Sequence, residues 1–164
     1  MRPCPRPMPT EATPRAPAAP TGPPRVRVIF QSDPMAVRAG LLSLRQGIGR
    51  LGIDGDLEGA LELVLAEVLN NVVEHAYGAA ARGLVDVRVG AVRGQIDCTV
   101  VDAGRPMPGG AMPPGTPPAP FPEPEGGFGW MIIRQLAQDL SYRREDGRNC
   151  LSFRLAGGLD ASAA

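Results

Sequence analysis

Residues 67–77 read EVLNNVVEHAY, and this stretch decides how the rest of the chain is interpreted. Leucine and valine recur around it at helical spacing, which predicts one long helix from about residues 54–56 to about residue 76. With about 3.6 residues per turn, Glu67, Asn71 and His75 lie in one column of that helix. One interpretation is that the column is simply the solvated side of an amphipathic helix.

The paired asparagines favour a second interpretation, in which the column is functional. Asparagine is a poor residue inside a helix because its amide competes for backbone hydrogen bonds. A carboxamide oxygen is a hard ligand suited to Mg²⁺, and a carboxylate one turn earlier can orient or deprotonate a hydroxyl group. Asn71 and Glu67 have this spacing, so they are candidates for a magnesium ligand and a base.

The segments on either side of this helix predict an α+β fold. Alternating apolar residues indicate strands, spacings of three and four indicate helices, and Arg93-Gly94 and Asp146-Gly147 indicate hairpin turns. Such an order predicts a mixed, mostly antiparallel sheet covered on one face by helices, as a two-layer sandwich. Besides the central helix, the predicted elements are strands 25–30, 84–89, 95–101, 140–144 and 148–155 and helices from about 34 to 52 and from 128 to 136.

The predicted strand 95–101 is followed by Asp102 and, two residues later, by Gly104. A carboxylate at a strand end can accept a hydrogen bond from an exocyclic amine, and a glycine lets a flat base approach the backbone. An ordinary Asx turn explains the same pattern equally well. Residues 103–127 are rich in proline and glycine, and a loop of this length within a domain is usually a functional lid or disordered.

A glycine-rich segment, residues 126–130 with the sequence GGFGW, stands at the start of the predicted helix 128–136. Glycines at a helix start expose backbone N–H groups to an anion and allow a phosphate to come close. A flexible hinge explains these glycines equally well. The chain contains no GxxxxGK(S/T) sequence, which excludes a P-loop.

The composition excludes several other classes of protein. The length of 164 residues suits one domain, and 17 basic residues balance 17 acidic ones, so no net charge attracts nucleic acid or a membrane surface. No apolar run approaches the roughly 20 residues that span a bilayer. Three separated cysteines and one histidine support neither a disulfide framework nor a zinc site. We expect a disordered proline-rich tail at 1–24 without an export signal, a domain at 25–156 and a flexible end at 157–164.

The order of these motifs resembles the N, G1 and G2 boxes of the ATPase superfamily that comprises gyrase, heat-shock chaperone and histidine-kinase domains. Within it, residues 67–77 and 126–130, followed by Ile133-Arg134 and residues 142–144, resemble the anti-sigma-factor serine kinases of bacterial partner-switching systems. The resemblance covers roughly residues 25–156. It implies a histidine-kinase-like ATPase fold that binds ATP and Mg²⁺.

The resemblance also implies roles for the central helix. Asn71 would hold Mg²⁺ and contact the nucleotide, and Glu67 would act as the base toward a serine of a protein substrate. His75 has two interpretations, a structural hydrogen bond near the end of its helix or a contact with nucleotide or Mg²⁺-bound water.

On the nucleotide side, the resemblance implies that Asp102 binds the adenine amine, with Gly104 beside the base and residues 105–125 as the lid. Because the chain contains no lysine, a contact to the γ-phosphate would come from an arginine, a hydroxyl such as Thr116, or the backbone. The glycines implied to cradle the phosphates are Gly127 and Gly129.

The implied function is that of a cytoplasmic anti-sigma-factor-type kinase that regulates transcription. It would phosphorylate a serine on an anti-anti-sigma antagonist, with a sigma factor as the rival partner and no direct contact with nucleic acid or membrane. The alternative is an ATP-binding regulatory module with little or no turnover, which acts by sequestering the sigma factor or the antagonist. Whether the chain forms a homodimer stays open.

Overall fold

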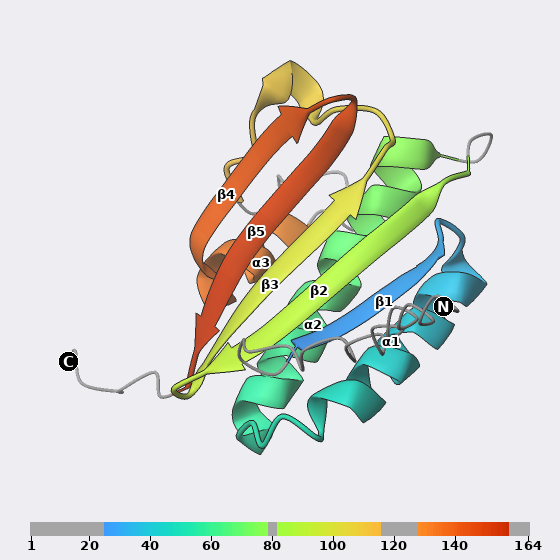
Figure 1. Ribbon diagram of the computed structural model, residues 1–164. Helices are drawn as coiled ribbons and strands as arrows, with labels where there is room; N and C mark the ends of the chain where they lie inside the picture. Colours follow the sequence, from blue (N-terminus) through green and yellow to red (C-terminus); the bar gives the residue numbers. More distant parts are fainter. Residues whose placement is uncertain (1–24, 79–81, 116–127, 158–164) are drawn as a thin grey trace, which may run out of the picture.

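The computed structural model of the protein describes residues 25–78, 82–115 and 128–157 (Figure 1). The predicted tail 1–24 and nearly all of the predicted end 157–164 lie outside these residues. The helices and turns are α1 (Pro34–Ile48), α2 (Gly55–Asn71), the π-helical segment η1 (Val72–Tyr77), the 3-10 turn η2 (Pro108–Gly110) and α3 (Gly129–Leu136). The strands are β1 (Arg25–Gln31), β2 (Leu84–Val92), β3 (Gln95–Asp102), β4 (Gln138–Glu145) and β5 (Arg148–Ala156).

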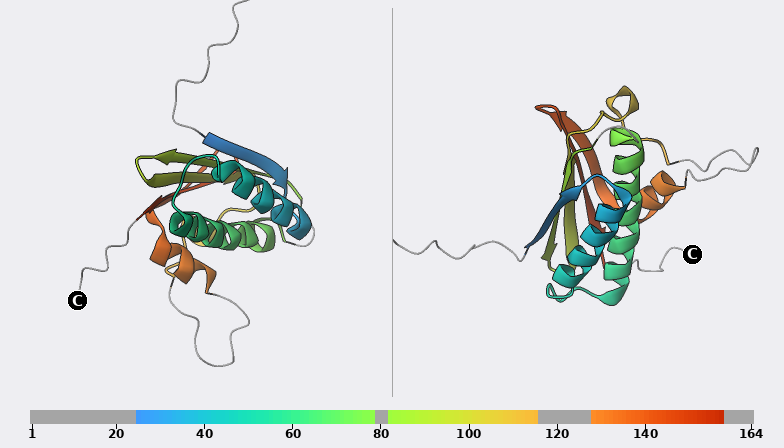
Figure 2. Two further views of the ribbon diagram at one scale, coloured as in Figure 1. Left: turned by 90° about the horizontal axis from the view of Figure 1, so that it is seen from below. Right: turned by 90° about the vertical axis from the view of Figure 1, so that its right-hand side faces the viewer.

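The strands form one sheet in the order β1-β2-β3-β5-β4, and every neighbouring pair is antiparallel. All three α-helices lie on the same face of this sheet, so the molecule has two layers (Figure 2). The two-layer α+β fold and the order of elements predicted from the sequence are therefore confirmed. Within the described residues, no helix is both long enough and apolar enough to cross a membrane.

The alternation of the strands places their apolar side chains against the helices. In β2, Val85, Val87 and Val89 are fully buried, and the side chains between them face away from the core. Helix α2 lies on this face and contributes the other side of the core. Its fully or nearly fully buried residues are Leu61, Val64, Leu65, Val68 and Leu69.

The start of each long helix follows the capping rules. The Asp33 carboxylate accepts hydrogen bonds from the N–H groups of Met35 (3.1 Å) and Ala36 (2.9 Å), and Pro34 occupies the first position of α1. The Asp54 carboxylate accepts from the N–H of Asp56 at 2.8 Å at the start of α2. These caps set the position at which each helix begins.

The end of the second helix differs from the prediction. Regular α-helical winding stops at Asn71, and η1 continues as a wider π-helix in which the N–H of Gly78 donates to the carbonyl of Val73 at 2.8 Å. The change in winding accompanies contacts made by Tyr77, the last residue of η1. The Tyr77 hydroxyl donates to the Leu84 carbonyl at 3.3 Å and accepts from the Ala103 N–H at 3.0 Å. The single column expected at α-helical pitch therefore ends at Asn71.

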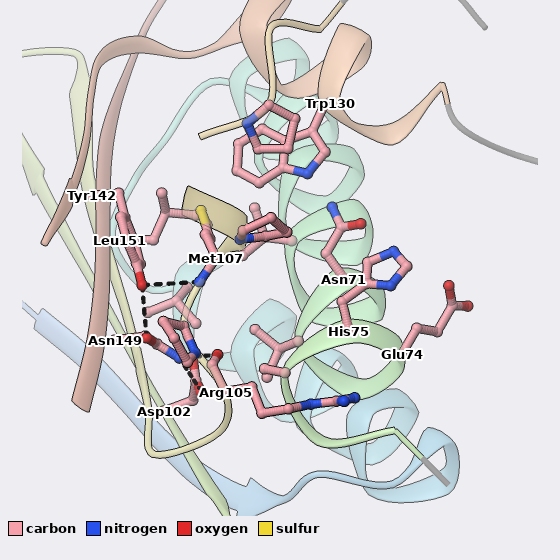
Figure 3. A pocket seen from close by; sticks show the side chains of 17 residues that line it. Asn71, Glu74, His75, Asp102, Arg105, Met107, Trp130, Tyr142, Asn149 and Leu151 are labelled. Carbon is pink, nitrogen blue, oxygen red and sulfur yellow. Dashed lines mark hydrogen bonds between the residues drawn. The ribbon is translucent and has the colours of Figure 1, made fainter. Parts of the chain in front are cut away.

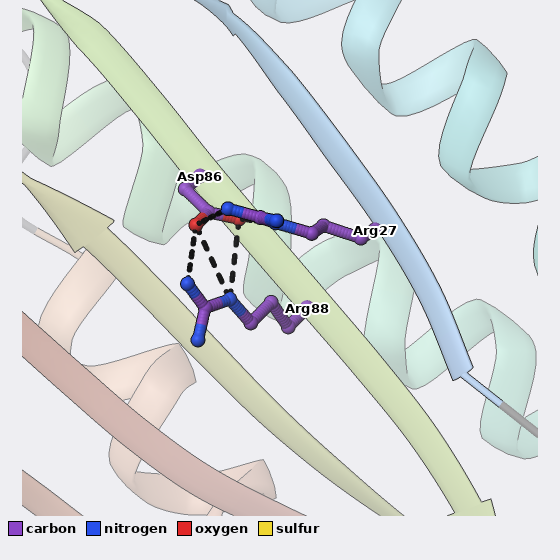
Figure 4. Close-up of polar contacts among 3 residues, drawn as sticks. All are labelled: Arg27, Asp86 and Arg88. Atoms are coloured by element: carbon purple, nitrogen blue, oxygen red, sulfur yellow. Dashed lines mark hydrogen bonds and ion pairs between the residues drawn. The ribbon is translucent and has the colours of Figure 1, made fainter. Parts of the chain in front are cut away.

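A charged cluster occupies the face of the sheet that the helices leave open (Figure 4). The guanidinium of Arg27 on β1 donates to both carboxylate oxygens of Asp86 on β2, at 2.9 and 2.8 Å. Arg88 donates to the same carboxylate at 2.6 Å. These two arginines lower the pKa of Asp86 from its usual 3.8 to about 2.

Asp86→Asn is expected to lower the free energy of unfolding at neutral pH by less than about 1 kcal/mol, because Arg27 is largely exposed. Since the folded state has the lower pKa, the wild type gains this stability above about pH 4 and loses it as the pH falls toward about 2. Urea unfolding at about pH 7 and about pH 3 measures the difference. Asp146→Asn, in an exposed hairpin turn, is the matched control. An equal loss at both pH values for Asp86→Asn would contradict the ion-pair explanation.

Candidate functional site

A cavity of about 520 Å³ lies between the end of α2, strands β3 to β5 and the segment that follows β3 (Figure 3). Cavities of this size are typical of sites for small molecules. Its walls are mostly apolar, with Val68 from α2, Val100 from β3, Leu151 from β5 and Trp130 from α3. Its polar groups are concentrated at two places, around Asp102 and around Asn71.

The first polar place is the end of β3. Asp102 is only 5% exposed, and its Oδ1 atom accepts hydrogen bonds from the N–H of Gly104 and from Nδ2 of Asn149, both at 2.8 Å. Burial raises the pKa of Asp102, whereas the bonds from Asn149 and Gly104 and the charge of Arg144 act in the opposite direction. The ordinary Asx turn is thus present at Asp102, and Asp102 lines the cavity as well.

The second polar place is the last α-helical turn of α2. Asn71 lines the cavity, and its Nδ2 atom is buried with no hydrogen-bond partner among the described residues. Buried amides in folded proteins are nearly always paired, so an unpaired one on a cavity wall is a candidate to bind a ligand in that cavity. Because rotation of the amide exchanges nitrogen and oxygen, the same side chain can present either a donor or an oxygen ligand.

Glu67 lies one turn before Asn71, against the first residue of α3. A Cβ atom built on Gly129 would lie 2.6 Å from Glu67 Oε2 and 3.6 Å from Asn71 Nδ2. A side chain at position 129 would therefore push the Glu67 carboxylate, the mobile end of its side chain, away from the start of α3. The acid-amide helix and the glycine-rich helix start, which are far apart in the sequence, meet at this point.

Comparison with known proteins assigns this arrangement to a family. Residues 30–155 match the family described as the histidine kinase-like ATPase domain. The chain belongs to this family. Blue-light-activated histidine kinase 2 from Erythrobacter litoralis (strain HTCC2594) is 36% identical over 83 residues, which is 50% of this chain and 21% of that protein.

A crystal structure of the RsbU and RsbW domains of Rv1364c from Mycobacterium tuberculosis has the same fold as this ATPase domain. The two share a TM-score of 0.57 at 17% sequence identity, over 81% of this chain and 32% of that one. The ATPase domain thus spans about a fifth to a third of the length of these proteins. Family membership implies ATP as a ligand.

The ATPase domain brings several of the predicted site residues together. Asn71, His75 and Asp102 line one cavity, with His75 exposed at its rim. Glu67 is not among the described residues that line the cavity, and its carboxylate lies beside Gly129. The predicted site residues Thr116 and Gly127 lie outside the described residues, and so does the lid beyond residue 115.

Two further residues line the cavity of the ATPase domain, Asn149 and Tyr142, and no sequence pattern predicted a role for either. Asn149 takes the first inward position of β5, a strand in which the later inward residues are apolar. A polar residue within that alternation is the signal that could have identified it. Tyr142 lies on the edge strand β4, and only the pairing of β4 with β5 brings it to the site.

Gly104 of the ATPase domain serves packing as well as the turn. A Cβ atom built on it would lie 2.7 Å from both the carbonyl oxygen and the Cβ of Ala76. The predicted reason for this glycine, close approach of a base, is therefore not needed to explain it. The strand end and the π-helical segment already require it.

Gly104→Ala is expected to destabilise the ATPase domain by about 1–3 kcal/mol, because the backbone of Ala76 would have to move. Gly59→Ala is the matched control, since Gly59 is an exposed position within α2 with no atom within 4 Å of the added Cβ. That control should stabilise the domain by about 0.5–1 kcal/mol. Thermal unfolding compares the two, and equal effects would contradict the packing argument.

Proposed function

We propose that this domain binds Mg-ATP in the described cavity and transfers the γ-phosphate to a serine of an anti-anti-sigma protein. The observation that carries the proposal is that Asp102 and Asn71 line the same cavity, with Glu67 and Gly129 close to the Asn71 amide. A carboxylate for the base and an amide for the phosphates thus face one cavity, and the start of α3 lies next to that amide.

At the base end, the adenine ring would lie against the apolar walls formed by Val100, Leu151 and Trp130. The carboxylate of Asp102 accepts a hydrogen bond from the exocyclic amine. A buried carboxylate is a selective partner because a nucleobase without a donor at that position leaves it unpaired.

At the phosphate end, Asn71 supplies the amide oxygen that would complete the coordination of Mg²⁺. Within the described residues, no group of three or more histidine, cysteine or acidic side chains is placed to hold a metal ion. The ion would accordingly be held mainly by phosphate oxygens and water, and it would neutralise charge on the phosphates. The backbone at the start of α3, with Gly129 as its first residue, lies beside this group.

The proposed reaction needs a base next to the transferred phosphate. The serine Oγ atom would bond to the γ-phosphorus while Glu67 accepts the hydroxyl proton. The bond between the γ-phosphorus and the oxygen that bridges it to the β-phosphate would break, which releases ADP. Glu67 lies close to Asn71, near enough to serve a hydroxyl group at that end of the cavity. Because Glu67 does not line the cavity as the structure describes it, its side chain would turn toward the γ-phosphate when the substrate arrives.

The partner class is supported by the sequence motifs that resemble anti-sigma-factor serine kinases, with a sigma factor as the rival partner and the cytoplasm as the location. A second candidate acceptor is a histidine, because a relative that is 36% identical over half of this chain is a histidine kinase. Glu67 does not line the described cavity, which favours a further alternative, an ATP-binding regulator with little turnover.

Incubation with γ-labelled Mg-ATP and purified antagonist-type proteins from the same genome tests these functions. The proposal predicts acid-stable label on a serine of one such protein. Acid-labile, base-stable label would move the assignment to histidine. Tight Mg-ATP binding without transfer to any candidate would favour the regulatory module.

A further inference from the structure

Asn149 uses all of the hydrogen-bonding capacity of its side chain inside the domain. Its Nδ2 atom donates to Asp102 Oδ1 at 2.8 Å and to the carbonyl of Arg105 at 3.0 Å. Its Oδ1 atom accepts from the Tyr142 hydroxyl at 2.8 Å and from the Arg144 guanidinium. The side chain is only 5% exposed. Its hydrogen bonds to β3, to the segment after β3 and to β4 together fix its orientation.

The two carboxylate oxygens of Asp102 differ in their hydrogen bonds. Oδ1 already accepts from Asn149 and from the N–H of Gly104. No hydrogen bond to Oδ2 is found within the described part of the chain, and Asp102 lines the cavity. An internal network therefore holds one oxygen while the other stays available to a ligand.

The same network reaches the segment after β3. The Tyr142 hydroxyl, which donates to Asn149, accepts a hydrogen bond from the N–H of Met107 at 3.1 Å (Figure 3). Arg144 also donates to the carbonyl of Gly104 at 3.0 Å. Asn149 thus connects the Asp102 carboxylate, through hydrogen bonds, to strand β4 and to the segment 104–107.

We propose that Asn149 is a positioning residue that, held by Tyr142 and Arg144, turns Asp102 so that Oδ2 accepts the exocyclic amine of a 6-aminopurine. The inference rests on the proposed binding of ATP and adds the origin of its base selectivity. A guanine would bring a carbonyl oxygen to the place of the amine, so two acceptors would face each other.

A nucleotide that lacks only the exocyclic amine distinguishes two roles of Asn149: orienting Asp102 toward that amine, and supporting the fold in general. Calorimetry gives Kd values for Mg-ATP and for the magnesium complex of purine riboside triphosphate, which has hydrogen in place of the amine. Asn149→Leu is expected to weaken ATP binding about 10-fold or more and to change binding of the amine-free analogue by about twofold at most. The preference of the wild type for ATP over the amine-free analogue would then be largely lost in the variant.

Tyr142→Phe provides a milder variant that keeps the ring and removes only the hydroxyl that orients Asn149. It should give a smaller loss with the same dependence on the amine. Ser152→Ala, two residues after Cys150 on the same strand and off the cavity wall, should change neither constant. Melting temperatures of all variants establish that they are folded.

An equal loss of affinity for both nucleotides in Asn149→Leu and Tyr142→Phe, or no loss in either, would overturn the positioning role while leaving ATP binding intact. Failure of the wild type to bind either nucleotide would instead overturn the proposed function and, with it, this inference.

Discussion

Asp102→Asn is expected to weaken Mg-ATP binding by a factor of at least about 100. Asp102 Oδ1 is held by donors from Gly104 and Asn149, so an amide at this position keeps its oxygen on that side. Its NH₂ group would then face the exocyclic amine of adenine, and two donors would meet in a buried place. The lost bond to a charged acceptor and the unpaired donor both reduce affinity.

Calorimetric titration with Mg-ATP measures this loss. Asp97→Asn is the matched control because Asp97 lies on the same strand and pairs with Arg154 away from the cavity. It should leave the Kd unchanged. Wild-type affinity in a folded Asp102→Asn protein would show that the base does not bind at the end of β3.

Glu67→Gln and Asn71→Ala are expected to separate phosphate transfer from binding. Glu67→Gln should slow transfer by about 10²–10⁴-fold with little change in the Kd for ATP, because the amide cannot accept the hydroxyl proton. Asn71→Ala should remove most of the magnesium-dependent part of ATP affinity, because the amide oxygen that completes the coordination is lost. Transfer should fall with it.

The neighbouring residues of α2 provide controls for these two variants. Asn70 and Glu62 are exposed on the same helix and outside the cavity wall, so Asn70→Ala and Glu62→Gln should behave as the wild type. Two measurements compare the variants. The first is single-turnover transfer of the γ-phosphate to the antagonist protein that accepts the label, and the second is the affinity for ATP with and without magnesium. If Glu67→Gln transfers phosphate normally while Asn71→Ala does not, the base is another group and the magnesium assignment stands.

Much of the fold could be predicted because its strands obey a simple alternation. Val85, Val87 and Val89 face the helices while the residues between them do not, and the hairpin turns at Arg93-Gly94 and Asp146-Gly147 fix the pairing. The π-helical winding of η1 could not be predicted. It accompanies contacts of Tyr77 and Ala76 with residues that come later in the chain.

Part of the candidate nucleotide site could also be predicted from breaks in the apolar pattern. Asn71 and Asp102 stand out in the sequence as polar residues on apolar elements, and both line the cavity. The role of Asn149 depends on the pairing of β3 with β5, which sets it opposite Asp102. The closeness of Glu67 to Gly129 depends on how α3 packs against α2, and no local pattern encodes that packing.

Trp130 provides the most direct test of the central claim, because it is the single tryptophan of the chain and lines the cavity. Its fluorescence is recorded while Mg-ATP is added to the wild type and to Asp102→Asn. The account predicts a saturable change in emission for the wild type that Asp102→Asn abolishes. An emission that stays constant up to millimolar Mg-ATP, or identical saturation curves for the two proteins, would contradict ATP binding between Asp102 and Asn71.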